Sequence, residues 1–116
     1  MTNVTPLDRD RPARATRQVL WMRDELTILT GLYGRMVAAG EWRDYAIDME
    51  ADEARFAAFR RAADRPEVTV VKRPALARKQ GQYALIGEHG QVLKRGGDVR
   101  ALLAPIERRL MKAVSG

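Results

Sequence analysis

The chain of 116 residues contains no cysteine, one histidine and one serine. Without cysteine it has no disulfide bond, no thiolate nucleophile and no zinc or iron–sulfur site with cysteine ligands. The only serine, Ser115, is the penultimate residue, and the only histidine, His89, falls in a predicted turn. A serine–histidine–acid arrangement is therefore not expected, which excludes hydrolysis of that type.

Long apolar runs are also missing. No stretch approaches the 18 consecutive apolar residues that indicate a transmembrane helix. Residues 1–17 contain two prolines and four arginines, and they lack the apolar core of a signal peptide. We expect a cytoplasmic protein without a membrane partner, in which residues 1–16 form a flexible arm and residues 17–114 form a single domain.

The whole chain has a formal net charge of +6, and its positive charge is concentrated in the second half. Residues 1–59 contain 8 basic and 10 acidic side chains, whereas residues 60–116 contain 13 basic and 5 acidic ones. This asymmetry favours a polyanionic or acidic partner for the second half. A well-solvated surface rich in arginine is the alternative explanation.

The first predicted helix has apolar residues at helical spacing across residues 26–37. Asp24 is a favourable N-cap, and Gly40 can supply the positive φ angle that commonly ends a helix. Gly31 and Gly34 lower the helix propensity of this segment. They predict close packing of another element against that face.

The last predicted helix begins at Asp98, which serves as its N-cap. Its apolar stripe runs through residues 99–110 and is interrupted by Pro105. Because proline has no N–H group and its ring clashes with the preceding turn, we expect a kink or a split there.

Alternating apolar residues, β-branched residues and turn signals predict five strands, at residues 42–49, 54–61, 67–72, 82–87 and 91–95. Gly90 supplies the positive φ angle of the last hairpin. Residues 17–22 suit a sixth strand, although they could also extend the first helix. Residues 54–62 are ambiguous, because the spacing of Phe56 and Phe59 fits a helix, and a strand would need a bulge to keep both rings on one face. The fold class is α+β, with an antiparallel sheet of four to six strands and two helices packed on one face.

One long motif, LYGRMVAAGEWRDYAID at residues 32–48, resembles a small bacterial family known only as domain of unknown function 2794. The resemblance covers about residues 18–113 and implies no activity, ligand, partner or catalytic residue. The resemblance favours a strand at residues 54–61. This sequence departs from the family pattern at Pro105, where the family implies an uninterrupted last helix. Further positions that carry the resemblance are Phe56, Phe59-Arg60-Arg61, Lys72-Arg73-Pro74, Leu76-Ala77-Arg78, Gln80-Gly81, Tyr83 and Leu93-Lys94-Arg95-Gly96.

Six basic residues are expected to gather if the strands form an up-and-down meander. Alternating strand directions bring them to one end of the sheet, beside the amino end of the last helix, whose N–H groups also favour an anion. The same parity places Arg60, Arg61 and Arg65 at the opposite end. The candidate site for an anion or nucleic acid consists of Lys72, Arg73, Arg78, Lys79, Lys94 and Arg95.

Internal charge pairing is the alternative for this basic end. The acidic residues of the segment 48–53 fall on the same edge of the sheet, and Asp98 already satisfies part of the helix end. The acidic segment lacks the glycine and the final glutamate of a calcium loop, so we expect a solvated hairpin tip. No metal and no cofactor are predicted.

These observations predict an uncharacterised, non-catalytic accessory protein that binds nucleic acid or nucleoprotein through the basic end. A module for protein interaction or regulation that docks an acidic protein is the second hypothesis, and an enzyme with an unrecognised site is the third. Scarce aromatic residues and the absence of a DNA-reading motif indicate phosphate contacts rather than base readout. We expect a monomer or a small homo-oligomer. Trp42, just after Gly40, should anchor helix to sheet, with an exposed partner-binding tryptophan as the alternative.

Overall fold

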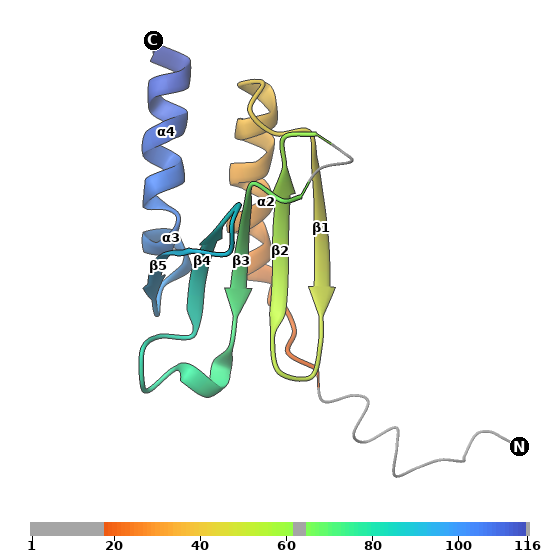
Figure 1. Cartoon of the computed structure of the whole chain (residues 1–116), viewed down its shortest axis with the longest axis vertical. Coiled ribbons are helices and arrows are strands. Elements are labelled where there is room, and N and C mark those ends of the chain that lie inside the picture. The colour runs from red at the N-terminus through yellow and green to blue at the C-terminus, as the bar shows by residue number, and fades with distance from the viewer. Residues whose placement is uncertain (1–17, 62–64, 116) are drawn as a thin grey trace, which may run out of the picture.

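The computed structural model describes residues 18–61 and 65–115 (Figure 1). The predicted arm at residues 1–16 therefore lies outside the described residues. In chain order the elements are α2 (Arg23–Ala38), β1 (Asp44–Met49), β2 (Ala54–Phe59), β3 (Val68–Lys72), the 3₁₀ turn η1 (Pro74–Leu76), β4 (Tyr83–Gly87), β5 (Val92–Gly96), α3 (Val99–Leu102) and α4 (Ala104–Ser115).

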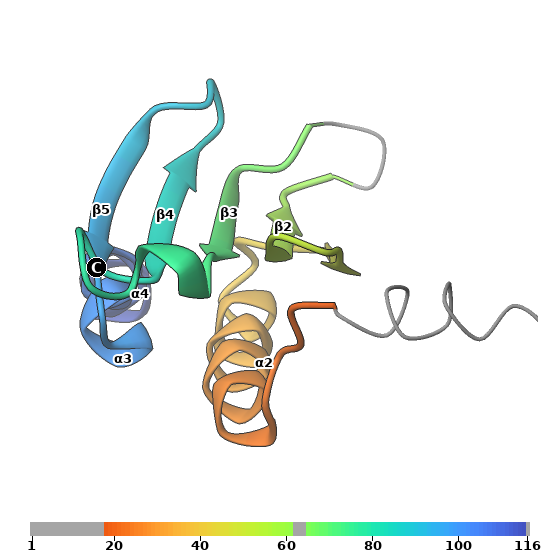
Figure 2. The ribbon, with the colours of Figure 1, turned by 90° about the horizontal axis from the view of Figure 1, so that it is seen from below.

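The five strands form one antiparallel sheet in the order β1-β2-β3-β4-β5. This is the predicted meander, in which each strand pairs with the next along the chain. Figure 2 shows α2, α3 and α4 on the same face of the sheet, with α2 under its middle strands and α3 and α4 under β4 and β5. The predicted α+β class is confirmed.

The ambiguous segment is a strand, β2, as the resemblance implied. The bulge that would keep both rings on one face is not formed, because β2 pairs in continuous register with both neighbours. Phe56 and Phe59 consequently point to opposite faces: Phe56 is buried under the helices, and Phe59 is half-buried on the other side. Among the described strands, the pairing is irregular only between β4 and β5, where Leu85 pairs with Lys94 and Ile86 with Val92, so that Leu93 of β5 is the extra residue.

Helix α2 begins at Arg23, with Met22 rather than Asp24 at the N-cap position. The Met22 N–H donates to Glu25 Oε1 at 2.7 Å, so the glutamate three residues on satisfies the free backbone group. At the other end Gly40 has φ = 78°, as predicted. The Glu41 N–H then donates to Met36 O at 2.8 Å, which closes the helix.

Two further expectations for this region are wrong. A side-chain Cβ at Gly31 or Gly34 would meet nothing within 4 Å, so neither glycine marks a close packing contact. Residues 18–22 form neither a strand nor an extension of α2. The segment is held instead by Val19 N–H, which donates to Glu50 O at 2.8 Å, and by the buried Trp21, whose Nε1 donates to Arg55 O at 3.1 Å.

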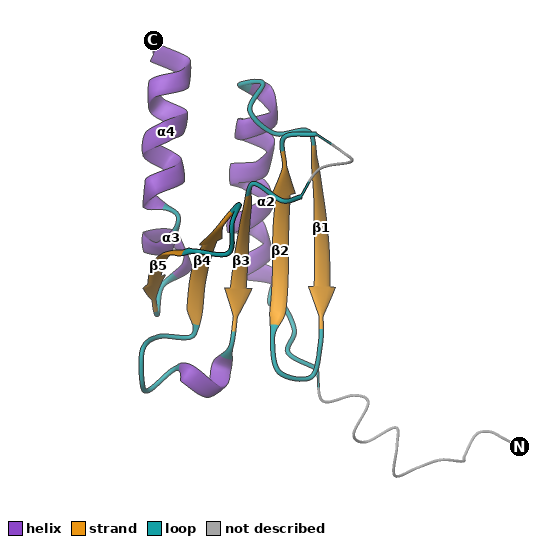
Figure 3. Cartoon of the chain, in the orientation of Figure 1, coloured by secondary structure: helices purple, strands orange, loops and turns teal. Residues whose placement is uncertain are grey.

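Pro105 splits the last helix, as predicted, into α3 and α4 (Figure 3). Proline is tolerated in the first turn of α4 because an N–H there has no intrahelical partner. Asp98 is the N-cap of α3, and its Oδ1 accepts the Arg100 N–H at 3.3 Å.

Trp42 lies in the core between α2 and the sheet, with only 3% of its surface exposed. Its ring stacks near Tyr33 of α2, with centroids 6.2 Å apart, and its Nε1 donates to Glu67 Oε1 at 2.7 Å. This placement confirms the anchoring role and excludes the exposed alternative. Across the described residues, no helix is long and apolar enough to cross a bilayer.

Candidate functional site

Lys72, one of the six residues of the predicted basic end, is buried. It is 8% exposed, and its Nζ donates to Leu20 O at 2.8 Å and to Glu25 Oε1 at 2.9 Å. The Tyr83 hydroxyl donates to the other carboxylate oxygen of Glu25. The prediction that Lys72 contacts phosphate is therefore wrong, because Lys72 shares its strand face with Val70 and points toward the helices.

The buried trio of Glu25, Lys72 and Tyr83, which we name the lock, is held together by hydrogen bonds between side chains. Burial alone raises the pKa of Glu25, but hydrogen bonds from Tyr83 and Lys72 outweigh it, and the pKa lies below its ordinary value. Burial, followed by the neighbouring Glu25 carboxylate, raises the pKa of Tyr83. All three side chains are buried. The lock joins α2 to β3 and β4.

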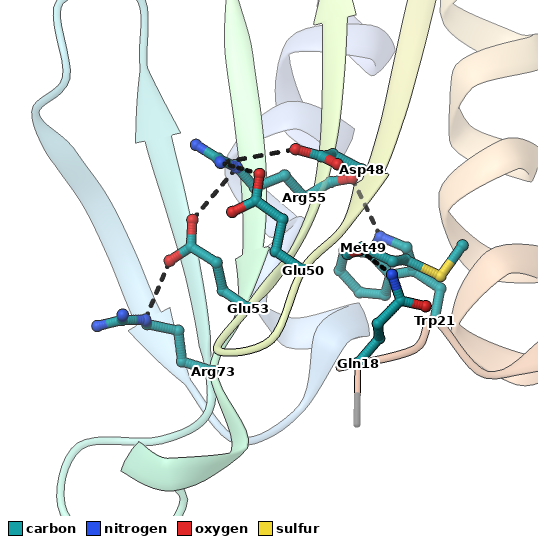
Figure 4. Close-up of polar contacts among 8 residues, drawn as sticks. All are labelled: Gln18, Trp21, Asp48, Met49, Glu50, Glu53, Arg55 and Arg73. Carbon is teal, nitrogen blue, oxygen red and sulfur yellow. Dashed lines mark hydrogen bonds and ion pairs between the residues drawn. The ribbon is translucent and has the colours of Figure 1, made fainter. Parts of the chain in front are cut away.

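Arg73 is exposed, but its charge is compensated by the acidic hairpin between β1 and β2. Its Nε lies 3.0 Å from Glu53 Oε1. In Figure 4 the neighbouring Arg55 points into the same acidic group, with Nη2 at 3.0 Å from Glu50 Oε2 and Nε at 3.2 Å from Glu53 Oε2. The alternative of internal pairing therefore holds for Arg73. No cluster of metal-ligating side chains occurs here or elsewhere in the part of the chain that the structure describes.

Lys94 lies in the middle of β5, opposite Leu85. Its Nζ donates to Ala101 O at 2.7 Å and so ties β5 to α3. The expected contribution of the helix end is also absent, because α3 has only four residues and Asp98 already accepts one of its N–H groups. Lys94 is consequently a weak candidate for contact with an external anion.

Three of the six predicted residues remain: Arg78, Lys79 and Arg95, which we name the basic edge. All three are exposed, and within residues 18–61 and 65–115 none of them forms an ion pair. They come from the loop before β4 and from β5, the last strand of the sheet (Figure 1).

A glycine contact brings the two parts of the basic edge together. Gly81 has φ = 88°, and a Cβ there would lie 2.5 Å from the carbonyl carbon of Gly96, so only glycine permits this approach. Lys79 precedes Gly81 by two residues, and Arg95 precedes Gly96 by one. At about 3.8 Å per residue, the Cα atoms of Lys79 and Arg95 therefore lie within about 15 Å of each other.

Arg60, Arg61 and Arg65 lie at the other end of the sheet from Arg95. Arg60 and Arg61 follow Phe59, which pairs with the first residue of β1, whereas Arg95 pairs with Ala84, near the start of β4. The predicted separation of these two groups is confirmed. The three arginines line a cavity of about 450 Å³ together with Gly40, Glu41, Glu67 and Glu88.

Glu67 is shared by two arginines at this far end: Arg60, whose Nε lies 3.6 Å from Glu67 Oε2, and Arg109 of α4. Glu67 accepts two hydrogen bonds from Arg109, at 2.6 and 3.0 Å, and one from Trp42. Burial raises the pKa of Glu67, but these hydrogen bonds outweigh burial and leave the pKa below its ordinary value. Sequence reasoning missed the pair of Glu67 and Arg109, because 42 positions separate the two residues and no local pattern links them.

The two edge strands of the sheet differ in charge. The first strand, β1, contains Asp44 and Asp48 and no basic residue, whereas the basic edge lies at the last strand. Four inter-strand spacings of about 4.8 Å separate these two edges by about 19 Å.

Comparison with known proteins gives one match. The family model described as protein of unknown function (DUF2794) matches residues 19–103. Helix α2, all five strands and α3 lie within the matched range, whereas α4 begins just after it. No curated protein and no solved structure matches the chain.

Proposed function

Because the chain belongs to the family of proteins of unknown function DUF2794, whose description names no activity, we propose its function from its own residues. We propose that it is a non-catalytic accessory protein that binds the phosphate backbone of nucleic acid, free or in nucleoprotein, through the basic edge. The observation that carries the proposal is that Arg78, Lys79 and Arg95 are exposed near the contact of Gly81 with Gly96, and that no carboxylate of the described residues forms an ion pair with them. Exposed guanidinium and ammonium groups are the side chains that most often contact phosphate.

The contrast with the other basic residues supports this choice. Arg55, Arg73 and Arg109 each form ion pairs with nearby glutamates, so an external anion would have to displace those partners. At the basic edge an anion displaces only water and counterions. The large aromatic side chains Trp21, Trp42, Phe56 and Tyr83 are buried in the core, so they offer no platform for base stacking. We therefore expect binding that depends little on nucleic-acid sequence.

The test is the salt dependence of binding to a labelled duplex of mixed sequence. Three phosphate contacts on B-form DNA predict a log–log slope of about −2.7, from about −0.9 per contact. Replacing Arg78 and Lys79 by alanine should reduce the magnitude of the slope by about 1.8 and weaken all sequences alike. The matched control is Arg60→Ala with Arg61→Ala, which removes the same charge at the opposite end of the sheet.

Two results would contradict the proposal. One is an absence of binding to both DNA and RNA at about 50 mM salt, where screening is modest. The other is a control double variant that loses as much slope as the double variant of the basic edge, since net charge alone would then explain the binding.

A second candidate function is the docking of an acidic protein at the same edge. It is favoured by the small size of the site, because three cations are fewer than the 6–10 phosphate contacts of a strongly salt-dependent DNA-binding protein. A pull-down from native cells with and without nuclease separates the two functions. Partners that disappear after nuclease treatment support nucleic-acid binding, and protein partners that persist support acidic docking.

A further inference from the structure

The edge strand β1 presents part of its backbone outward. Among the described residues it pairs only with β2. The Tyr45 N–H donates to Asp44 Oδ1 at 2.8 Å, and the Met49 C=O accepts from Gln18 Nε2 at 3.0 Å, so both groups face away from β2. Alternate residues of an antiparallel strand direct N–H and C=O to the same side. Ile47, midway between these two residues, therefore also turns its backbone outward.

An apolar strip lies beside this backbone on the helix-bearing face. Tyr45 is 43% exposed and Ile47 is 37% exposed, which is unusual for side chains that face the covered side of a sheet. The Tyr45 ring packs edge-on against Tyr33 of α2, with centroids 4.8 Å apart. Val37, one turn further along α2, is also exposed. An edge strand flanked by exposed apolar side chains is a surface suited to association.

Acidic side chains occupy the other face of β1 and argue against pairing with a second copy. Symmetric antiparallel pairing centred on Ala46 would place Asp44 opposite Asp48 of the second copy, twice. Pairing centred on Ile47 would place Asp44 opposite Glu50, again twice. Like charges directly opposite each other destabilise a strand pair, whereas basic side chains in these positions would be attracted.

We propose that β1 is a docking edge for an extended segment of another protein in which basic and apolar side chains alternate. The segment adds a sixth strand and bonds its backbone to that of Ile47, which is the β-augmentation mode of peptide recognition. Its apolar side chains cover Tyr45 and Ile47. Its cations face Asp44 and Asp48, and at Asp48 they share the carboxylate with Arg55 of β2, whose Nη2 lies 3.6 Å from Asp48 Oδ2. This inference rests on β1 alone and does not depend on the basic edge.

A synthetic peptide tests the proposal on the full chain. The probe is a labelled, end-capped heptapeptide that alternates lysine and valine, and its binding is followed by fluorescence anisotropy. In antiparallel pairing the residues opposite Ile47 carry their side chains on the helix-bearing face, so the valines bond to β1 and the lysines direct their N–H groups to solvent. N-methylation of the valines should weaken binding at least tenfold, and N-methylation of the lysines should weaken it less than threefold.

Variants of β1 give a second, independent test. Ile47→Pro removes an outward N–H that β2 does not use, so proline is tolerated there while strand addition is lost. We expect at least tenfold weaker binding for this variant and less than twofold for the control Ile47→Val. Asp44→Asn with Asp48→Asn should weaken binding about threefold to tenfold and reduce its salt dependence. Circular dichroism checks that each variant is folded.

Each alternative outcome has its own signature. Equal effects of the two N-methylation patterns would overturn strand addition and leave only charge attraction. Equal binding of a peptide that alternates glutamate and valine would overturn the role of Asp44 and Asp48. Concentration-dependent assembly of the chain without peptide, lost in Ile47→Pro, would assign β1 to a second copy of the protein instead.

Discussion

The two edge strands of the sheet, β1 and β5, have side chains of opposite charge. At β1 the exposed backbone is flanked by carboxylates on one face and by Tyr45 and Ile47 on the other. At β5 the strand is tied to α3 through Lys94 and carries the basic edge, of which Arg95 is part. An open sheet must protect both of its edges from indiscriminate pairing. The edge at β1 is protected by its carboxylates and by the side chains of Asp44 and Gln18, which bond its outward backbone groups. The edge at β5 is protected by its positive charge and by the neighbouring helix α3.

A chain of net charge +6 can therefore present one acidic and one basic surface. The edges lie about 19 Å apart, which exceeds the screening length of about 8 Å at physiological salt. A ligand at one edge is therefore nearly independent of the charges at the other.

The largest expected effect is that of Trp42→Ala, which should reduce the free energy of unfolding by about 3–5 kcal/mol through the cavity it leaves. Because Trp42 lies just before β1, amide hydrogen exchange should accelerate more in β1 than in β5. The control Trp42→Phe retains most of the ring and should cost about half as much. Unchanged melting of Trp42→Ala would contradict the anchoring role.

Glu25→Gln should be the next most damaging change, at about 3 kcal/mol measured by chemical denaturation, because it leaves Lys72 buried without its counter-charge. Since Lys72 lies in the central strand β3, the amides of β1 and β5 should lose protection from hydrogen exchange equally. Asp24→Asn, at the exposed neighbouring position, is the matched control and should change stability by less than about 0.5 kcal/mol. A loss confined to one edge would show that the lock supports only that side.

Gly81→Ala should cost about 2 kcal/mol or more, since it combines a positive φ angle with a clash against Gly96. Gly90→Ala is its control, because Gly90 also has a positive φ, of 84°, but an added Cβ there meets nothing within 4 Å. It should cost only about 1 kcal/mol. Gly81→Ala should also weaken duplex binding while peptide binding at β1 persists. Equal costs of the two substitutions in thermal melts would refute the close approach.

The pH dependence of stability should report the buried lock. The pKa of Glu25 is depressed in the folded state, so its contribution is complete above the unfolded value of about 4.5 and is lost as the pH falls through the folded value. A pKa that is lower by one unit in the folded state corresponds to a contribution of about 1.4 kcal/mol to the free energy of unfolding. Between pH 7 and pH 3 the free energy of unfolding should therefore decrease more steeply in the wild type than in Glu25→Gln. Parallel curves would mean that Glu25 titrates normally.

The smallest expected effects are those of substitutions at one edge on ligand binding at the other edge. Asp44→Asn with Asp48→Asn should change duplex affinity by less than about twofold at 0.15 M salt, because the distance exceeds the screening length. Arg78→Ala with Lys79→Ala should likewise leave peptide binding at β1 unchanged. Large cross-effects in either titration would mean that the two surfaces are one continuous site.

Much of the architecture was predictable because it depends on neighbouring residues. The short turns at residues 50–53 and 88–91 impose the hairpins of β1 with β2 and of β4 with β5, whereas eight residues connect β2 to β3 and ten connect β3 to β4. Gly40 and Gly90 have the predicted positive φ angles. Pro105 splits the last helix because proline has no N–H group. The far placement of Arg60 follows from counting strand directions. The start of α2 was misplaced, because Glu25 bonds back to Met22 and displaces Asp24 from the cap.

The candidate site was only half predictable, because a basic residue in sequence does not reveal its partner. Arg78, Lys79 and Arg95 are exposed. Lys72 pairs with Glu25, which lies 47 positions earlier in the sequence, and Arg73 pairs with Glu53, which lies 20 positions earlier. Likewise Gly31 and Gly34 predicted a packing contact that the structure does not contain. Ion pairing depends on which side chains the folded sheet brings within about 4 Å.

The positions and order of the five strands, the antiparallel meander and the excess of positive charge in the second half follow from periodicity, turn residues and composition. The folded chain is needed to exclude a sixth strand at residues 18–22 and to show which charges are available to a partner. Strand register sets the face on which each side chain lies, and a shift of one residue moves it from solvent to core. For that reason Lys72 became part of a buried lock, while the contact of Gly81 with Gly96 assembled the basic edge at the opposite side of the sheet from the acidic β1.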